Sequence, residues 1–205
     1  SHLPVIMALR IRANHMTGSF ICKDNRAPEY SAKNPYPRAL RDYGRIVLPP
    51  STYTQEREKF ETRLPAARRF IVEHGLNEHF PGEGGPAGII MQGGQYGTVL
   101  RGLQLLGAAD AFGNTGLPLL VLNVIHPLVP EQVEDFLRGK EHVLIVEEGN
   151  PAFIEQEVAA LAQRAGLPCR IWGKEITPGS GVFPMAGEYT ADVVRAGLAD
   201  WLASL

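Results

Sequence analysis

Residues 87–107, AGIIMQGGQYGTVLRGLQLLG, decide the fold. The short apolar run at 87–91 predicts a buried strand, and the two glycines that follow it permit a tight turn. The next apolar side chains recur at helical spacing and predict a helix that ends near Gly107: Val99, Leu100, Leu103 and Leu106. A strand, a tight turn and a helix in this order are typical of a parallel α/β sheet.

The alternation continues along the chain. Apolar runs predict further strands at 119–124, 143–146 and 169–172. Helices are predicted at 55–74, with a possible kink at Pro65, at 130–139, and after Asn150-Pro151, which supply an N-cap and a first-turn proline. Thr190 caps a final helix whose inward positions are Val194, Leu198, Trp201 and Leu205. The pattern predicts a mostly parallel sheet that is covered by helices on both faces.

Composition excludes several classes of function. The chain has 205 residues, 44% of them hydrophobic, and a net charge of −2. This length predicts one folded domain with an appendage, and the net charge argues against a basic surface for nucleic acid. No apolar run reaches the length that crosses a membrane, and no secretory signal is predicted. The two cysteines, Cys22 and Cys169, make no metal site by themselves and favour a reducing, cytoplasmic location.

The first quarter of the chain differs from the rest. Residues 1–20 contain a strand-like apolar run and look like the end of something larger. Residues 21–52 hold five of the sixteen prolines, which predicts an irregular, extended linker with a single short strand at 45–48. The α/β domain is expected from residue 53 to residue 205.

Two groups of residues, a glycine-rich turn and a pair of glutamates, are candidates for function. The turn at 93–97, with Gly93 and Gly94, matches neither the dinucleotide fingerprint nor the P-loop, so it either permits close packing or contacts a phosphate. Glu147 and Glu148 end the central strand and point to opposite faces, so they either bind a partner or cap the next helix. Asn123 and His126 are expected at the same edge of the sheet.

The loop at 179–189 carries apolar side chains but few helix formers, which predicts a docking surface. Ser180 lacks the spacing of a nucleophile elbow. The residues thus predict a docking module without catalytic or metal-binding residues. A stand-alone module that binds a phosphorylated metabolite or coenzyme A at the 93–97 turn stays open as an alternative, and a small hydrolase is a weaker one.

Three stretches carry a resemblance to a known family: IIMQGGQYGTVLRGLQLLGAADAFGNTG from residue 89, VEEGNP at 146–151 and FPMAGEYT at 183–190. They resemble indolepyruvate:ferredoxin oxidoreductase, in its alpha-subunit or fused form, a member of the thiamine diphosphate-dependent 2-oxoacid:ferredoxin oxidoreductases. The resemblance implies that residues 53–205 form a transketolase C-terminal-like domain. Such a domain is a three-layer α/β/α sandwich with a mixed five-stranded sheet, in which residues 45–48 would be the antiparallel edge.

The resemblance also implies a part of a longer enzyme. Residues 1–20 would be the tail of a pyrimidine-binding domain, where Arg12 and His15 are weak candidates for cofactor contacts, along with Gly93 and Gly94. The whole enzyme would use thiamine diphosphate, Mg²⁺ and four-iron four-sulfur clusters, with coenzyme A and ferredoxin as reactants. No GDG motif or cysteine-rich run occurs in this chain, so we expect no cofactor in it and no activity. The remaining domains and a second copy in a homodimer are its expected partners.

Overall fold

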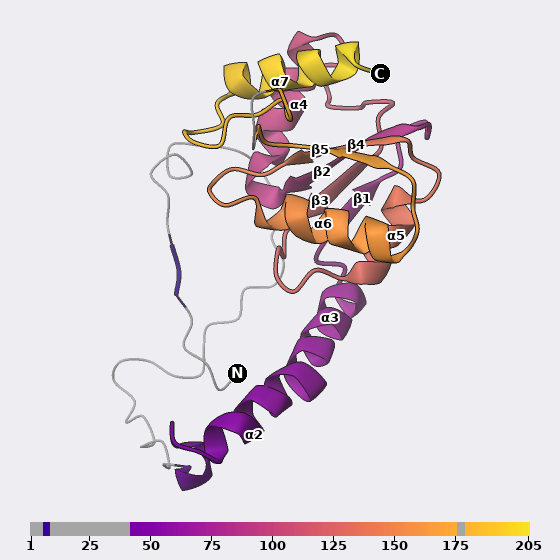
Figure 1. Ribbon diagram of the computed structural model, residues 1–205. Coiled ribbons are helices and arrows are strands. Elements are labelled where there is room, and N and C mark those ends of the chain that lie inside the picture. Colours follow the sequence, from indigo (N-terminus) through magenta and orange to yellow (C-terminus); the bar gives the residue numbers. More distant parts are fainter. Residues whose placement is uncertain (1–5, 9–41, 176–178) are drawn as a thin grey trace, which may run out of the picture. The chain divides into compact units, whose positions relative to one another are not determined.

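The computed structural model describes residues 6–8, 42–175 and 179–205 (Figure 1). The chain divides into two compact units, Ser1–Tyr43 and Gly44–Leu205. The second unit contains every helix and strand that the structure describes, apart from a 3₁₀ turn at Tyr43–Arg45 that spans the boundary. Arg12, His15 and most of the expected linker lie outside the described residues.

The second unit is built on a five-stranded mixed sheet with the strand order β1-β3-β2-β4-β5 (Figure 1). The strands are β1 (Glu78–Phe80), β2 (Ala87–Gln92), β3 (Leu119–Leu122), β4 (His142–Val146) and β5 (Arg170–Trp172). β2 pairs in parallel with β3 and β4, β4 pairs in parallel with β5, and β1 runs antiparallel to β3. The predicted mixed sheet with four parallel strands and one antiparallel edge is confirmed.

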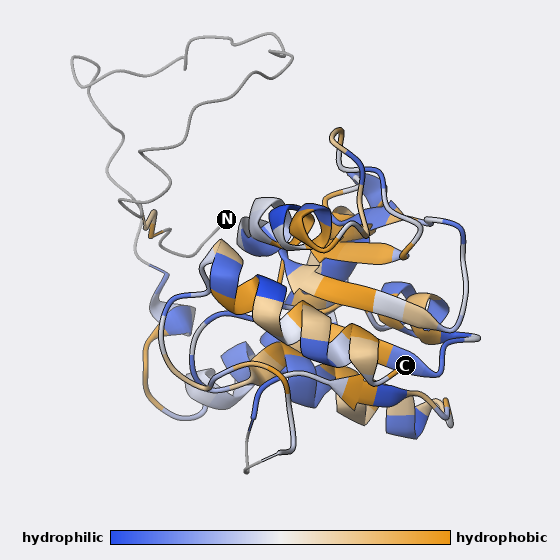
Figure 2. Cartoon of the chain, turned by 90° about the horizontal axis from the view of Figure 1, so that it is seen from above, coloured by the Kyte–Doolittle hydropathy of each residue, from blue (hydrophilic) through white to orange (hydrophobic). Residues whose placement is uncertain are grey.

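Helices cover both faces of this sheet. They are α4 (Tyr96–Leu105), α5 (Pro130–Leu137), α6 (Phe153–Arg164) and α7 (Ala191–Ala203). Alternate residues of β2 divide between two cores: Ile89 and Met91 pack with α4 and α7, and Ile90 packs with α5 and α6. Strand side chains alternate in this way because successive residues point to opposite faces. In Figure 2 the central strands are mostly orange, whereas the helices carry both orange and blue residues.

The antiparallel edge is not where the resemblance placed it. Residues 45–48 form no strand; a 3₁₀ turn at Tyr43–Arg45 leads into a bend, with Val47 and Leu48 exposed. The two prolines that follow, Pro49 and Pro50, lack the N–H groups that a strand ladder needs. The edge is instead β1, which pairs with β3 through the register Glu78–Val121.

The helix predicted at 55–74 is longer than expected. It comprises α2 (Ser51–Glu58), a π-helical turn (Lys59–Arg63) and α3 (Leu64–Glu73). Pro65 lies in the first turn of α3, and the helix continues through it (Figure 1). The π turn immediately before it closes with a bond from Leu64 N–H to Lys59 O, five residues back. A π turn holds one residue more than an α-helical turn, and this extra residue accommodates the proline. The helix therefore widens locally where a kink was predicted.

The start of α6 also differs from the prediction. Asn150 and Pro151 neither cap nor begin this helix, which starts at Phe153 after a residue with non-helical torsion angles, Ala152. Thr190 does cap α7, accepting from the N–H of Val193. At the other end of α7, Trp201 is fully buried, whereas Leu205 lies beyond the helix and is exposed.

Candidate functional site

The sheet reverses its winding direction between β2 and β4. The chain leaves β2 for α4, which packs on one face, and leaves β4 for α6, which packs on the other. Helices that diverge from neighbouring parallel strands open a crevice at the carboxyl ends of those strands, where ligands of open α/β sheets bind. The residues that follow β2 and β4 are therefore the candidate site, and they include the 93–97 turn and the two glutamates predicted from the sequence.

Glu147, directly after β4, is 5% exposed and caps α6. Its two carboxylate oxygens accept from the N–H of Ile154 at 3.1 and 3.0 Å, and one also accepts from the N–H of Glu155 at 3.2 Å. These N–H groups are the free donors of the first helical turn, where the helix dipole favours negative charge. The anion position at the start of α6 is thus filled by the chain's own carboxylate, so the capping interpretation of Glu147 is correct.

Glu148 turns to the opposite face, as adjacent strand residues do. Its carboxylate accepts from Gln95 Nε2 at 2.7 Å and from the N–H of Tyr189 at 3.2 Å. Its backbone is held by Gln92, whose side chain accepts from Glu148 N–H at 2.9 Å and donates to Glu148 O at 3.3 Å. Glu148 therefore ties the ends of β2 and β4 to the segment before α7.

A buried lysine joins the same edge to β5. Lys174 is 2% exposed, its ammonium donates to the carbonyl of Gly149, and its N–H donates to Glu155 Oε2 at 2.9 Å. Burial raises the pKa of Glu155, and the nearby Glu147 carboxylate raises it further, although the bond from Lys174 acts in the opposite direction. The pKa of Tyr189 is also raised, first by burial and then by the same group of carboxylates.

The glycine turn after β2 is partly a packing device. Gly93 lies against the side chain of Asn123, and a Cβ at Gly93 would collide with it. A Cβ at Gly94 or at Gly97 would meet no atom within 4 Å, and no side chain caps α4. The packing interpretation of the turn therefore applies to Gly93. Gly94 and Gly97 border open space, so the phosphate-contact interpretation stays open for them.

Asn123 and His126 separate in the structure. Asn123 Nδ2 donates to Leu76 O at 3.0 Å and to Glu78 Oε1 at 2.8 Å, which fixes the edge strand β1. His126 lies with Glu147 and Glu148 in the lining of a cavity of about 840 Å³ that also reaches Phe153 of α6. His126 therefore shares the crevice with the two glutamates, as expected. The side chain of Asn123 instead forms its hydrogen bonds at β1 and the residues before it.

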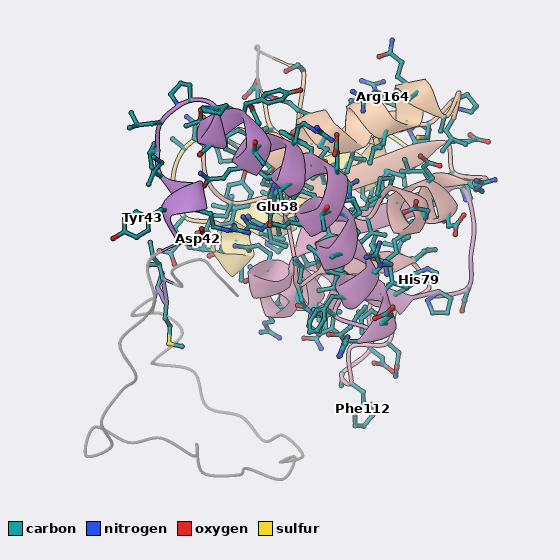
Figure 3. All side chains as sticks on the ribbon, turned by 90° about the horizontal axis from the view of Figure 1, so that it is seen from below. Asp42, Tyr43, Glu58, His79, Phe112 and Arg164 are labelled. Atoms are coloured by element: carbon teal, nitrogen blue, oxygen red, sulfur yellow. The ribbon has the colours of Figure 1, made fainter. Side chains whose placement is uncertain are left out.

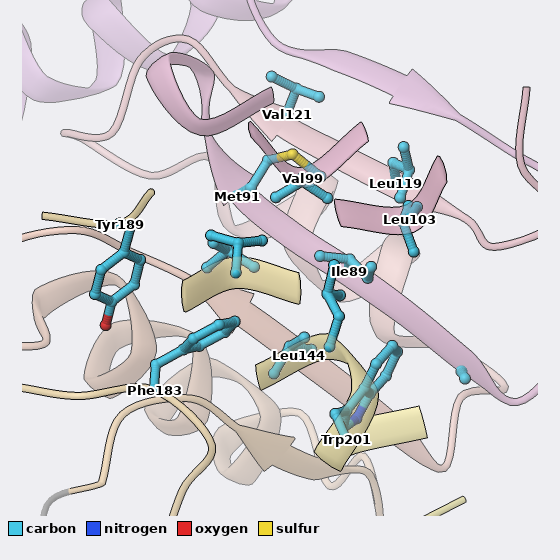
Figure 4. Close-up of a cluster of buried hydrophobic side chains, with 14 residues drawn as sticks. Ile89, Met91, Val99, Leu103, Leu119, Val121, Leu144, Phe183, Tyr189 and Trp201 are labelled. Carbon is cyan, nitrogen blue, oxygen red and sulfur yellow. The ribbon is translucent and has the colours of Figure 1, made fainter. Parts of the chain in front are cut away.

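The apolar loop predicted as a docking surface belongs to the core. Phe183 and Tyr189 are each 1% exposed, their ring centroids lie 5.2 Å apart, and both join the cluster of α4 and α7 (Figure 4). Tyr189 Oη donates to the carbonyl of Pro184 at 2.8 Å. The prediction that the 179–189 loop presents its aromatic side chains for docking is wrong, because Phe183 and Tyr189 fill the space between α7 and the sheet, although the residues between them are mostly exposed.

Sequence reasoning missed two structural features of this edge. Lys174 gave no signal, because a lysine next to a glutamate near a strand end is typical of a solvated surface. Gln92 and Gln95 flank the glycine pair. These two amide side chains could have been recognised from the sequence, but the interpretation of the turn considered only its glycines. Within the described residues no three His, Cys, Asp or Glu side chains come together as metal ligands, and no helix there is long and apolar enough to span a membrane.

Comparison with known proteins identifies relatives. No family model matches the chain. It is 30% identical over 195 residues to indolepyruvate oxidoreductase subunit IorA of Methanothermobacter thermautotrophicus, covering 94% of this chain and 29% of that subunit. It is 34% identical over 137 residues to IorA of Archaeoglobus fulgidus, covering 67% of this chain and 19% of that subunit.

The chain thus spans less than a third of the length of the curated relatives that it matches. Among solved structures, an inactive beta4 tetramer of a split-gene transketolase shares 17% identity with a TM-score of 0.43, over 62% of this chain and 42% of that one. The resemblance of this chain to the indolepyruvate oxidoreductases is confirmed, and its relatives are subunits of an oxidoreductase.

Proposed function

We propose that this chain is a structural and subunit-contact domain of an indolepyruvate-type 2-oxoacid:ferredoxin oxidoreductase, without a complete active site of its own. The whole enzyme would oxidatively decarboxylate an aryl-2-oxoacid to the acyl-coenzyme A and pass two electrons to ferredoxin. Thiamine diphosphate, Mg²⁺ and iron–sulfur clusters would be held by other parts of the enzyme, in the cytoplasm. The similarity to IorA subunits supports the parent activity.

The observation that carries this proposal is the use of the crevice by the chain itself. The N–H groups that could receive a phosphate at α6 are occupied by Glu147, and the neighbouring Glu148 adds a second negative charge. A pyrophosphate placed here would displace one carboxylate and face the other, which Coulomb repulsion disfavours. The occupied start of α6 does not fit a pyrophosphate, which supports the proposal that other parts of the enzyme hold thiamine diphosphate.

Calorimetric titration with thiamine diphosphate and Mg²⁺ tests this function. We expect no saturable binding up to millimolar cofactor, because Glu147 occupies the N–H groups at the start of α6 and the described residues hold no cluster of metal ligands. The same titration without Mg²⁺ is the control for metal-independent binding of the pyrophosphate. Saturable, Mg²⁺-dependent binding in the micromolar range would overturn the proposal, because it would require a complete cofactor site within this chain.

A second function, binding of a phosphorylated metabolite or coenzyme A at the glycine turn, is favoured by the open space at Gly94 and Gly97. No side chain caps α4, which leaves room for a phosphate at its start, although the N–H of Tyr96 already donates to Gly93 O in the 3₁₀ turn (Gly93–Gln95) that precedes the helix. Two neighbours oppose it. The negative Glu148 carboxylate, which accepts from Gln95 Nε2 at 2.7 Å, would repel a phosphate. The buried Gln95 Oε1 has no hydrogen-bond partner among the described residues, and as an acceptor it suits a ligand's donor group rather than a phosphate oxygen.

A further inference from the structure

The cavity that His126, Glu147 and Glu148 line continues along one side of α6, and its volume of about 840 Å³ is in the range of small-molecule sites. Four residues of α6 share this side and line the cavity: Phe153, Glu157, Ala160 and Arg164. Their spacing of four, three and four residues keeps them on one side of a helix over roughly 16 Å. Glu147 occupies only the N–H groups at the start of α6, so the rest of this cavity stays open to a ligand.

The end of the cavity at the carboxyl edge of the sheet carries apolar side chains. Phe153, at the start of α6, is 66% exposed, and Ile125, in the loop after β3, is 47% exposed. Pro151, just before α6, adds further apolar surface. Exposed aromatic and aliphatic side chains that gather in one cavity are typical of a site for an apolar group. This end of the cavity therefore suits a ring.

The two charged residues of α6 in the cavity have no partner among the described residues. Glu157 is half-exposed and Arg164, the last residue of α6 (Figure 3), is exposed, and the side chain of neither forms a hydrogen bond or an ion pair there. They lie two helical turns apart. A helical side chain leans toward the amino terminus of its helix, so the long Arg164 side chain extends toward Glu157. The cavity thus offers one carboxylate and one guanidinium to a ligand.

The positions of the charges set the direction of a ligand. Glu147 and Glu148 lie at the apolar end of the cavity, and their carboxylates repel an anion there. Glu157 lies one turn from Phe153, so it favours a cation close to the ring. Arg164, at the far end of α6, favours a carboxylate, which a guanidinium binds through two parallel hydrogen bonds.

We propose that this cavity binds a small zwitterion with an apolar ring, of the class of the aromatic 2-amino acids. The ring packs against Phe153 and Ile125, the ammonium group pairs with Glu157, and the carboxylate pairs with Arg164. This inference goes beyond the proposed function and does not depend on it. An aryl-2-oxoacid, the substrate class proposed for the whole enzyme, has the ring and the carboxylate but no ammonium group, so Glu157 discriminates against it.

Calorimetric titration of the purified chain with L-phenylalanine tests the site. We expect saturable binding with a dissociation constant of about 0.1–1 mM, the usual range for a ligand of this size. Three smaller probes each lack one group: phenethylamine lacks the carboxylate, 3-phenylpropionate lacks the ammonium group, and L-alanine lacks the ring. Each should bind about tenfold more weakly or worse, because each leaves one part of the cavity without its contact.

Charge-removing variants assign each group of the ligand to its residue. Glu157→Gln and Arg164→Gln should each weaken L-phenylalanine binding by about fivefold or more. Glu157→Gln should leave the binding of 3-phenylpropionate unchanged, and Arg164→Gln should leave that of phenethylamine unchanged, because each probe lacks the group that the lost charge contacts. Arg101→Gln is the matched control, because Arg101 is an exposed residue of α4, on the other face of the sheet.

The ring contact has its own pair of variants. Phe153→Ala should weaken L-phenylalanine binding by about fivefold or more, because it removes the exposed ring from the cavity. Phe112→Ala should leave it unchanged, because Phe112 is 92% exposed and points away from the ribbon at the tip of a separate loop (Figure 3). Circular dichroism should show that every variant remains folded.

Two results would overturn the site. One is the absence of saturable binding of L-phenylalanine up to 10 mM. The other is binding that Glu157→Gln and Arg164→Gln both leave unchanged, because the ligand would then lie elsewhere on the chain. Binding of 3-phenylpropionate as tight as that of L-phenylalanine would also contradict the zwitterion, because it would show that the ammonium group makes no contact.

Discussion

Phe183→Ala should lower the free energy of unfolding by about 3–5 kcal/mol, the usual cost of removing a fully buried aromatic side chain. Phe183 is 1% exposed, and its ring lies so close to Gly197 of α7 that a Cβ there would approach Cδ1 of the ring to 2.6 Å. The alanine would leave a cavity between α7 and the loop before it. Urea unfolding followed by circular dichroism measures the change.

Phe112→Ala is the matched control for this prediction. It removes the same side chain from a position that is 92% exposed, so its stability should remain within about 0.5 kcal/mol of the unaltered chain. If Phe183→Ala were as stable as Phe112→Ala, the loop at 182–189 would be a surface loop. The docking role predicted for it from the sequence would then return.

Glu147→Ala should lower the free energy of unfolding by about 2–3 kcal/mol. The substitution removes the cap of α6 and leaves the N–H of Ile154, in a largely buried position, without an acceptor. An unsatisfied buried donor costs about 1–3 kcal/mol, and loss of a helix cap costs about 0.5–2 kcal/mol, with part of each shared. Thermal and urea unfolding measure the loss.

The control for Glu147 is Glu157→Ala, in the second turn of α6. Glu157 lines the same cavity but is half-exposed, so its removal should change stability by less than about 0.5 kcal/mol. Glu147→Gln retains an acceptor oxygen and should lie between the two. If Glu147→Ala proved as stable as Glu157→Ala, the carboxylate would be free for a ligand, and its structural role at α6 would be refuted.

The sequence predicted the sheet well because its strands carry strong signals. β2, β3 and β4 are continuous apolar runs, each followed by a turn and an amphipathic helix. That pattern arises only where both faces of a sheet are covered. Gly107, Gly139 and Gly166 each adopt a positive φ just after a helix, so these three helix ends were readable too.

The errors occurred where tertiary contacts outweigh local patterns. β1, with the sequence EHF, is short, polar and held by one neighbour, so nothing in its composition separates it from a loop. The N-cap of α6 comes from Glu147, six residues before the helix begins, whereas the local signal Asn150-Pro151 indicates an earlier start. Phe183 and Tyr189 lie in an irregular segment without periodicity, and burial there depends on α7 folding over it.

The candidate site was predicted by position but not by role. The sequence placed Glu147, Glu148 and the glycine turn at one edge of the sheet, because the carboxyl ends of parallel strands meet there. It left open whether the carboxylates bind a partner or the chain itself, because hydrogen-bond partners such as Tyr189 come from a distant segment. Lys174, which the same edge buries, was out of reach of any local pattern.

The most direct test of a self-occupied crevice is a two-dimensional NMR titration of the labelled chain with thiamine diphosphate and Mg²⁺, followed by coenzyme A. The amides to watch are those of Ile154 and Glu155 at the start of α6, and those of Gly94 and Gly97 at the glycine turn. We predict that all four resonances stay in place up to millimolar ligand. Saturable shifts of Ile154 and Glu155 would contradict this account, because they would show that a ligand displaces Glu147 from the helix.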